Sequence, residues 1–326
     1  MTAPGQRTTL PEAESAATPI EGSSVAVVIP CHNEEKTIGR VVSRFREVLP
    51  GADIIVVENA CQDETVLSAT AAGARIVQEP RLGKGYALLA GFAAASDAEY
   101  CVMVDGDDTY PVREAPAMLA EAANGADMVV GTRLATGHSD AFPAGHGVGN
   151  RLFIGLVRLL FGIRTRDLFS GYRVFTRRFL DSVSISATGF DVEAEISIQA
   201  QVHGFQVAEH AVAYRPRHPD TKSKLRPLHD GSRILRGIIL LFRDYRPVAF
   251  FGWLAALLLI AALLSGWAPV SDYVETGMVD HMPRAVLAAG LVILAALSLS
   301  LGVLLSSINR RSADSEFESS LRRRGR

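Results

Sequence analysis

Cysteine is scarce in this sequence of 326 residues, and its three copies lie far apart. Cys31, Cys61 and Cys101 form no Cys-x-x-Cys pair, and their number is odd. A framework of disulfides is therefore not expected, and the pattern is typical of a protein in a reducing compartment. The eight histidines also lack the close spacing of zinc ligands, so no zinc site is expected.

The sequence also lacks an excess of charge of either sign. Its 33 Lys and Arg residues nearly balance 35 Asp and Glu residues, for a formal net charge of −2. A nucleic-acid-binding protein usually carries a broad basic field, so we expect no nucleic-acid partner. Residues 1–24 have no apolar core of the signal-peptide type and are rich in Thr, Ala, Pro and Glu, which predicts a disordered tail.

Short apolar runs alternate with helical patterns from residue 25 to residue 130. This alternation predicts a parallel α/β sheet with helices on both faces. Ligands of such sheets bind beyond the carboxyl ends of the strands. Polar clusters follow three of the predicted strands, so we expect one site at this edge of the sheet. The predicted strands are 25–30, 54–57, 75–77, 100–104 and 128–130, and the polar clusters are 30–34, 58–59 and 105–108.

An acidic turn, Asp105-Gly106-Asp107-Asp108, follows one of these strands directly. Carboxylates gathered so closely repel one another unless a cation lies between them. Their hard oxygen atoms suit Mg²⁺ or Mn²⁺, which also bridges substrate phosphate oxygens. We expect Asp105 and Asp107 to be the working pair and Asp108 to be a solvated neighbour. A fully solvated acidic turn is the alternative.

Basic residues that could meet a diphosphate are also present. Lys84, within Gly83-Lys84-Gly85, opens a predicted helix, where the helix dipole favours an anion. Arg133 follows the last predicted strand, and Arg173 lies in the segment FSGYR. Each arginine, taken singly, is equally compatible with an ordinary surface position.

Two uncharged apolar stretches, 247–267 and 285–308, differ from the rest of the chain. Each is about twenty residues long, the length of a helix that spans a bilayer. Arginines lie outside both stretches, whereas the connection 268–284 is mildly acidic. The positive-inside rule then places the N-terminal domain and the C-terminal tail in the cytoplasm. The segment 231–246 is predicted to be an amphipathic helix at the membrane interface, with an ordinary packing helix as the alternative.

The sequence resembles the family 2 glycosyltransferases, most closely those that use dolichol phosphate or another polyprenyl phosphate. The resemblance runs from about Val25 to Pro247 and rests on an ordered set of motifs. They are VVIPCHNEE (Val27–Glu35), VVENACQDET (Val56–Thr65), GKG (Gly83–Gly85), VMVDGDDTY (Val102–Tyr110), GTR (Gly131–Arg133), DLFSGYRVF (Asp167–Phe175), GFDVEAEI (Gly189–Ile196) and the basic segment Arg217–Lys224. Two terminal membrane helices also match a subgroup of these enzymes.

The resemblance implies a GT-A-like fold for binding a nucleotide-diphosphate sugar: a Rossmann-type mixed sheet with helices on both faces. It implies inverting transfer of the sugar, with Mg²⁺ or Mn²⁺ as cofactor, to a polyprenyl phosphate of the dolichyl or undecaprenyl type. The enzyme would be a multi-pass protein of the cell membrane. Its expected parts are a tail over 1–24, a catalytic domain over 25–230, a juxtamembrane helix over 231–246, a two-helix transmembrane region over 247–308 and a basic cytoplasmic tail over 309–326.

The resemblance also implies the residues of the site. The nucleotide sugar is expected at Pro30, His32, Glu34, Glu58, Asn59, Lys84, Asp105 and Arg133, and the metal at Asp105, Asp107 and Thr109. The acceptor phosphate is expected at Ser170, Arg173, Arg217, Lys222 and Lys224, with Asp191 and Glu193 on the sugar side. Asp107 and Asp167 are the expected catalytic residues. Asp167 would act as a base or position the acceptor, with a turn-forming aspartate as the alternative. Glu58 and His32 stand where the family usually has Asp and Tyr or Leu, so the nucleotide base stays open.

Two other functions are compatible with this fold. A processive polysaccharide synthase would carry a Gln-x-x-Arg-Trp motif and more membrane helices, and neither Trp253 nor Trp267 completes that motif. A non-catalytic, membrane-tethered nucleotide-sugar-binding protein could lose the acidic, Gly-Lys-Gly and Ser-Gly-x-Arg elements, all of which are intact. A dinucleotide-dependent oxidoreductase is not expected, because no Gly-x-Gly-x-x-Gly follows the first strand. Self-association as a homo-oligomer stays open.

Overall fold

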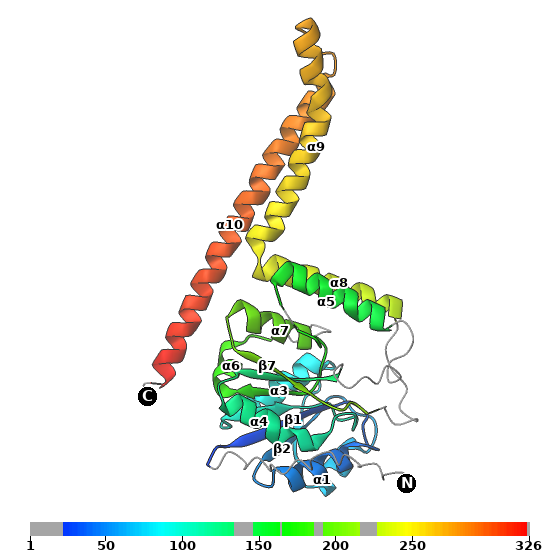
Figure 1. Ribbon diagram of the computed structural model, residues 1–326, viewed down its shortest axis with the longest axis vertical. Helices are drawn as coiled ribbons and strands as arrows, with labels where there is room; N and C mark the ends of the chain where they lie inside the picture. The colour runs from blue at the N-terminus through cyan, green and yellow to red at the C-terminus, as the bar shows by residue number, and fades with distance from the viewer. Residues whose placement is uncertain (1–21, 134–145, 164, 186–191, 216–226, 325–326) are drawn as a thin grey trace, which may run out of the picture.

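The computed structural model describes residues 22–133, 146–163, 165–185, 192–215 and 227–324 (Figure 1). A layered α/β domain is covered on one side by a pair of helices, and a long helical hairpin projects away beyond them. The C-terminal part of the second hairpin helix runs back beside the domain (Figure 1). The predicted tail over 1–24 lies almost wholly outside the described residues, as do Asp191, Arg217, Lys222 and Lys224.

A mixed sheet of seven strands forms the centre of the described α/β domain, in the order β3-β2-β1-β4-β6-β5-β7. The strands are β1 (Val25–Cys31), β2 (Asp53–Glu58), β3 (Arg75–Gln78), β4 (Tyr100–Met103), β5 (Met128–Thr132), β6 (Arg173–Thr176) and β7 (Val207–Ala211). The pairs β3–β2, β2–β1, β1–β4 and β5–β7 are parallel, and β6 is antiparallel to both of its neighbours. The five predicted strands are confirmed as β1 to β5. The sequence patterns did not predict β6 and β7.

Strand β6 lies between β4 and β5, although it follows both in the chain. Its first residue, Arg173, pairs with Met103, the last residue of β4. Because the two strands are antiparallel, the segment before β6 arrives at the carboxyl end of β4. This register brings residues 167–172 to the edge of the sheet where the site is expected.

Helices cover both faces of the sheet, as predicted. Alternate residues of β1 point to opposite faces, as the pleat requires. Val27 packs in one core with Phe45 and Met118, and Val28 packs in the other with Leu88. The helices of the domain are α1 (Ile38–Val48), α2 (Thr65–Ala71), α3 (Lys84–Ala94), α4 (Ala115–Ala123), α6 (Arg177–Ser182) and α7 (Val192–Val202), with a short 3₁₀ turn, η1, over Val112–Glu114.

Helix α3 packs closely against the sheet at Gly91. A Cβ atom at this position would lie 2.3 Å from Cγ1 of Val28 and 3.0 Å from Cγ2 of Val57. Because those distances require the sheet or the helix to shift, we expect Gly91→Ala to lower the free energy of unfolding by about 1–3 kcal/mol, the usual cost of overpacking a core. Thermal unfolding of the full-length protein measures the effect.

Gly39→Ala in helix α1 is the matched control for this prediction. Its added Cβ atom would meet only the Ser68 carbonyl oxygen, at an ordinary contact distance of 3.5 Å. We expect this change to stabilise the protein by up to about 1 kcal/mol, because alanine is a better helix former than glycine. If Gly91→Ala melted at or above the wild-type temperature, the close approach of α3 to the sheet would be wrong.

Helices α5 (His146–Phe161) and α8 (Pro227–Tyr245) lie side by side between α7 and the hairpin (Figure 1). The rings of Phe161 and Phe242 meet edge to face, with centroids 5.9 Å apart. Other apolar side chains of the pair face outward, and Leu159 is 80 % exposed. Helix α8 covers the predicted amphipathic segment 231–246 except for its last residue, begins four residues earlier, and packs on the domain through Ile238 and Phe242. Helix α5 was not predicted.

Helices α9 (Pro247–Thr276) and α10 (Met282–Arg324) form the hairpin. Pro247–Thr276 and Met282–Asn309 are each long and apolar enough to cross a membrane. Most of the predicted connection, 268–284, is helical, because α9 continues to Thr276 and α10 already begins at Met282. The two helices also pack on each other, and the Ser298 hydroxyl donates to the Phe251 carbonyl oxygen at 3.0 Å.

Candidate active site

The acidic turn begins just beyond β4, at the carboxyl edge of the sheet, as predicted. Within it, Oδ1 of Asp107 accepts hydrogen bonds from the Thr109 hydroxyl at 2.6 Å and from the Thr109 backbone N–H at 3.3 Å. Thr109 is completely buried, and Asp107 is 7 % exposed. Thr109 therefore orients the Asp107 carboxylate, and its expected role as a metal ligand stays a prediction.

Asp108 is not the solvated neighbour that the sequence predicts. Its backbone is left-handed, with φ of 59°. Its carboxylate forms ion pairs with Arg44 at 2.5 Å and Arg40 at 3.3 Å, both on α1, and its side chain is only 13 % exposed. Asp108 thus holds the turn against α1.

Lys84 is the first residue of α3 and joins two carboxylates from distant parts of the chain. Its Nζ atom lies 2.5 Å from Oδ1 of Asp105 and also donates to Oε1 of Glu193, near the start of α7. Burial opposes the charge of Lys84, but the Asp105 and Glu193 carboxylates outweigh it and raise the pKa of Lys84 well above its ordinary value. Lys84 is therefore charged at any physiological pH.

Asn59 supports the loop that leads to Lys84. Its side-chain Nδ2 donates to the carbonyl oxygens of Glu79 at 2.9 Å and Arg81 at 2.8 Å, and its Oδ1 accepts from the Gly83 N–H at 2.8 Å. Asn59 is only 4 % exposed. With both kinds of polar atom engaged in this way, Asn59 orders the loop that leads to Lys84, and its contact with a nucleotide stays a prediction.

The other residues expected to contact the nucleotide lie at the same edge. Nδ1 of His32 is hydrogen-bonded to the Asn59 carbonyl oxygen at 2.7 Å, and the Glu34 backbone N–H donates to the Thr65 hydroxyl at 2.8 Å. These bonds tie the loop after β1 to the loop after β2. The half-buried members of the set are Pro30, His32, Glu34 and Glu58.

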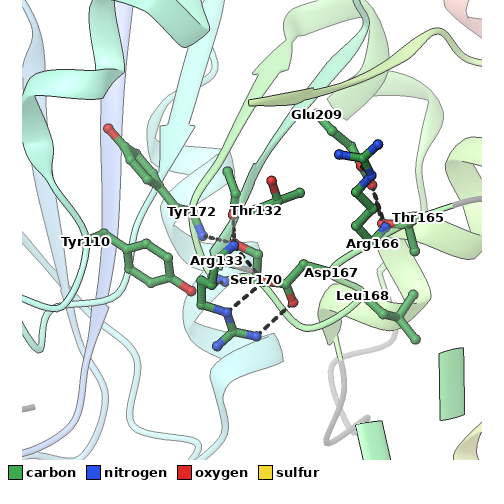
Figure 2. Close-up of polar contacts among 12 residues, drawn as sticks. Tyr110, Thr132, Arg133, Thr165, Arg166, Asp167, Leu168, Ser170, Tyr172 and Glu209 are labelled. Carbon is green, nitrogen blue, oxygen red and sulfur yellow. Dashed lines mark hydrogen bonds and ion pairs between the residues drawn. The ribbon is translucent and has the colours of Figure 1, made fainter. Parts of the chain in front are cut away.

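Arg133 and Asp167 form a buried ion pair (Figure 2). The Nε and Nη2 atoms of Arg133 donate to Oδ2 and Oδ1 of Asp167 at 2.7 and 2.8 Å, and the Arg133 backbone N–H adds a third bond at 3.2 Å. Asp167 is wholly buried, and the Arg133 side chain is 15 % exposed. Because Arg133 engages both carboxylate oxygens, the geometry favours a positioning role for Asp167 over that of a general base.

The segment after Asp167 turns into the protein and takes Ser170 and Arg173 with it. Both are wholly buried. Arg173 donates to the carbonyl oxygens of Leu168 and Ser170 at 2.9 and 3.0 Å and to the Ser197 hydroxyl at 2.9 Å. The Ser170 hydroxyl donates to the Gly131 carbonyl oxygen at 2.5 Å. The two side chains therefore order this segment, and their expected contact with an acceptor phosphate stays a prediction.

Gly171 brings the same segment against the acidic turn. A Cβ atom at this position would lie 2.1 Å from Oδ2 of Asp105, so only glycine permits the approach. The Gly171 N–H donates to the Tyr110 hydroxyl at 2.9 Å, which fixes the segment from its other side. The acidic turn and the segment 167–172 are thus parts of one site.

Glu209 is a site residue that the sequence patterns missed (Figure 2). Its Oε1 accepts hydrogen bonds from the Thr165 hydroxyl at 2.8 Å and from the Arg166 N–H at 2.7 Å. These bonds anchor the residues just before Asp167 to strand β7. No motif surrounds Glu209, and its partners lie more than forty residues earlier, so no local pattern in the sequence could have identified it.

The residues of the acidic turn fit a cation that is shared with a substrate. In the parts of the chain that the structure describes, no group of three or more His, Cys, Asp or Glu side chains could by itself hold a metal ion. Mg²⁺, however, is commonly bound by one or two carboxylates together with substrate phosphates and waters. Asp105 and Asp107 provide such a pair, with the hard oxygen atoms that Mg²⁺ and Mn²⁺ prefer.

Comparison with known proteins places this site among enzymes of sugar transfer. Residues 26–183 match the family model described as glycosyl transferase family 2. Glycosyltransferase AglJ of Haloferax volcanii is 31 % identical over 229 residues, which cover 70 % of this chain and 75 % of that protein. The dolichyl-phosphate hexose transferase of the same organism is 32 % identical over 216 residues, which cover 66 % and 92 %.

A solved structure also shares the fold. Glucosyl-3-phosphoglycerate synthase from Mycobacterium tuberculosis, in complex with Mn²⁺, uridine diphosphate and phosphoglyceric acid, superposes with a TM-score of 0.55 at 26 % identity. The match covers 68 % of this chain and 78 % of the synthase.

Proposed function

Because this chain belongs to glycosyl transferase family 2, we propose that it transfers a hexose, with inversion, from a nucleotide-diphosphate sugar to a polyprenyl phosphate at the cytoplasmic face of the cell membrane. The observation that carries the proposal is the contact between the acidic turn and the segment 167–172, which joins a donor half and an acceptor half in one site. The relative named for dolichyl phosphate supports the acceptor, and the synthase bound to Mn²⁺ and uridine diphosphate supports the donor and the cation.

The donor half is built from the carboxyl ends of the parallel strands. Asp105 and Asp107 would hold the divalent cation, which when bound would neutralise charge on the leaving diphosphate. Lys84 lies at a helix start that favours phosphate, and the guanidinium of Arg133 is a second diphosphate contact. Pro30, His32, Glu34 and Glu58 would line the nucleotide, and Asn59 would hold the Lys84 loop in place.

The acceptor half needs little help from a general base. A phosphate oxygen is already anionic near neutral pH, so orientation and charge stabilisation dominate the reaction. Asp167 would contribute to this orientation, because its two carboxylate oxygens hold the Arg133 guanidinium in one position. Arg217, Lys222 and Lys224, which lie outside the described residues, remain our proposed contacts for the acceptor phosphate, where Arg and Lys are the usual ligands.

The membrane half of the chain supports a lipid acceptor. Helices α9 and α10 would span the bilayer as two passes, with the arginines outside them on the cytoplasmic side. The paired helices α5 and α8 lie at the base of this hairpin, between it and the sheet (Figure 1). Their exposed apolar side chains would lie at the bilayer surface. A lipid phosphate at that surface would approach the site from the side of the acceptor half.

The direct test is a panel of radiolabelled nucleotide sugars offered to the purified full-length protein with a polyprenyl phosphate. We expect label from one donor to enter the organic phase as a single-sugar lipid, and only when Mn²⁺ or Mg²⁺ is present. A long glycan product would instead identify a processive polysaccharide synthase. Nucleotide-sugar binding without transfer to any lipid phosphate would identify a non-catalytic binding protein.

A further inference from the structure

The contact of Lys84 with two carboxylates has a consequence for the order in which ligands bind. Lys84, Asp105 and Glu193 come from α3, from the turn after β4 and from α7, so three separate elements meet at one ammonium group. The side chains of Lys84 and Asp105 are 30 % and 26 % exposed, whereas that of Glu193 is 9 % exposed. Glu193 is thus the buried end of the cluster, and Asp105 is the end that a ligand reaches.

The Lys84 ammonium competes with a divalent cation for the same oxygen atom. Its Nζ atom lies 2.5 Å from Oδ1 of Asp105, so a cation coordinated by that oxygen would be placed beside a like charge. The ammonium must therefore move before Asp105 can act as a full metal ligand.

A diphosphate gives the ammonium another partner. Lys84 opens α3, where backbone N–H groups and the helix dipole attract phosphate. The preceding loop is held by the bond from the Gly83 N–H to Asn59, so rotation of the Lys84 side chain is the movement that we expect. Glu193 stays beside it and keeps the displaced ammonium near the site.

We propose that Lys84 is the internal counter-ion of the donor-free enzyme: it suppresses cation binding at Asp105 until a nucleoside diphosphate takes it over, with Glu193 as the positioning residue that retains it. This inference rests on the proposed function, because it needs a diphosphate ligand. Glu193 then holds the displaced ammonium, and the cation binds together with the donor and not before it.

Binding of Mn²⁺ to the purified full-length protein, measured by the electron paramagnetic resonance signal of the unbound ion, tests this role without any turnover. In the wild type, Mn²⁺ alone should bind weakly and should bind tightly once uridine or guanosine diphosphate is added. In Lys84→Met, Mn²⁺ alone should bind at least about tenfold more tightly, since a charge partner at this distance shifts ionic equilibria by one decade or more. The gain on adding nucleotide should shrink accordingly.

Two further variants separate direct occupancy from a general charge effect. Arg40→Met removes a positive charge that contacts Asp108 of the same turn but not Asp105, and it should change Mn²⁺ affinity less than about twofold. Glu193→Gln should lower the affinity for Mn²⁺ alone, whereas Lys84→Met should raise it. Without the Glu193 carboxylate, Lys84 has Asp105 as its main carboxylate partner and occupies it more fully. This second direction keeps the test decisive even if Lys84→Met fails to fold.

The proposal is overturned if the wild type binds Mn²⁺ equally well with and without nucleotide. It is also overturned if Lys84→Met and Arg40→Met give the same change, or if Glu193→Gln leaves Mn²⁺ affinity unmoved. Failure of the proposed function gives a different result: neither nucleoside diphosphate would bind to the wild type in the presence of Mn²⁺, whatever the effect of Lys84→Met on Mn²⁺ alone.

Discussion

Asp107→Asn is expected to lower the rate of sugar transfer by a factor on the order of 10²–10³, the cost of removing one group that stabilises charge in a transition state. Asparagine keeps the shape of the side chain and an oxygen that accepts the two hydrogen bonds from Thr109. Only the negative charge is lost. Initial rates of label transfer into lipid, measured across a Mn²⁺ titration, report the effect, while the melting temperature and membrane insertion should not change.

Asp108→Asn is the matched control from the same turn. Asparagine tolerates the left-handed backbone of residue 108. The change removes partly exposed ion pairs to Arg40 and Arg44, for which we expect a loss of about 0.2–1 kcal/mol in stability and little change in transfer rate. Near-normal turnover of Asp107→Asn in the presence of a chelator would show that the assignment of the cation to this turn is wrong.

Asp167→Asn is expected to destabilise the protein by about 3–5 kcal/mol, because it leaves the Arg133 guanidinium without its charged partner in a buried place. For a domain of this size the loss corresponds to a fall in melting temperature of roughly 6–20 °C. Transfer should fall as well, because Arg133 is no longer held in one orientation. Thermal unfolding and initial rates at a temperature where the variant is folded measure the two effects separately.

Controls for Asp167 distinguish a positioning residue from a base. Asp181→Asn breaks an exposed pair with Arg177 on α6 and should shift the melting temperature by only about 2 °C or less. The double change Arg133→Met with Asp167→Leu should recover stability but not transfer. If Asp167 were a base, the pH profile of kcat for Asp167→Asn, measured where the variant is folded, would change in addition to the melting temperature.

The first half of the fold follows from local patterns. The run VAVVIP and its successors are continuous and β-branched, which is the composition of strands covered on both faces. Strand β6 could not be predicted from such a pattern, because it has only four residues and begins with Arg173. The buried guanidinium of Arg173 donates to carbonyl oxygens of the segment that precedes the strand. A short strand that begins with a charged residue carries no apolar run, so its place in the sheet is decided by tertiary contacts.

The structure brings the predicted polar clusters to one edge of the sheet, but the sequence did not indicate the partners of individual side chains. The clusters after β1, β2 and β4 converge because parallel strands end at a common edge. Residue type, however, does not show which partner a polar side chain finds across the fold. An asparagine after a strand has the same sequence pattern whether it binds a nucleotide or a neighbouring loop. The side chain of Asn59 forms its hydrogen bonds with the loop before Lys84. Arg133 and Asp167 meet across 34 positions, and no spacing rule connects them.

The late arrival of β6 also bears on synthesis of the chain at the ribosome. When β5 has emerged, β4 still lacks its neighbour on one side, because β6 comes some forty residues later and must be inserted between them. An unpaired strand edge is a template for wrong pairing with other chains. The nascent protein therefore carries an open sheet until residues 173–176 close it, and the acidic turn gains its contact with Gly171 at the same moment. The contact of the acidic turn with Gly171 and the pairing that fills the gap between β4 and β5 therefore both depend on the same segment of the chain.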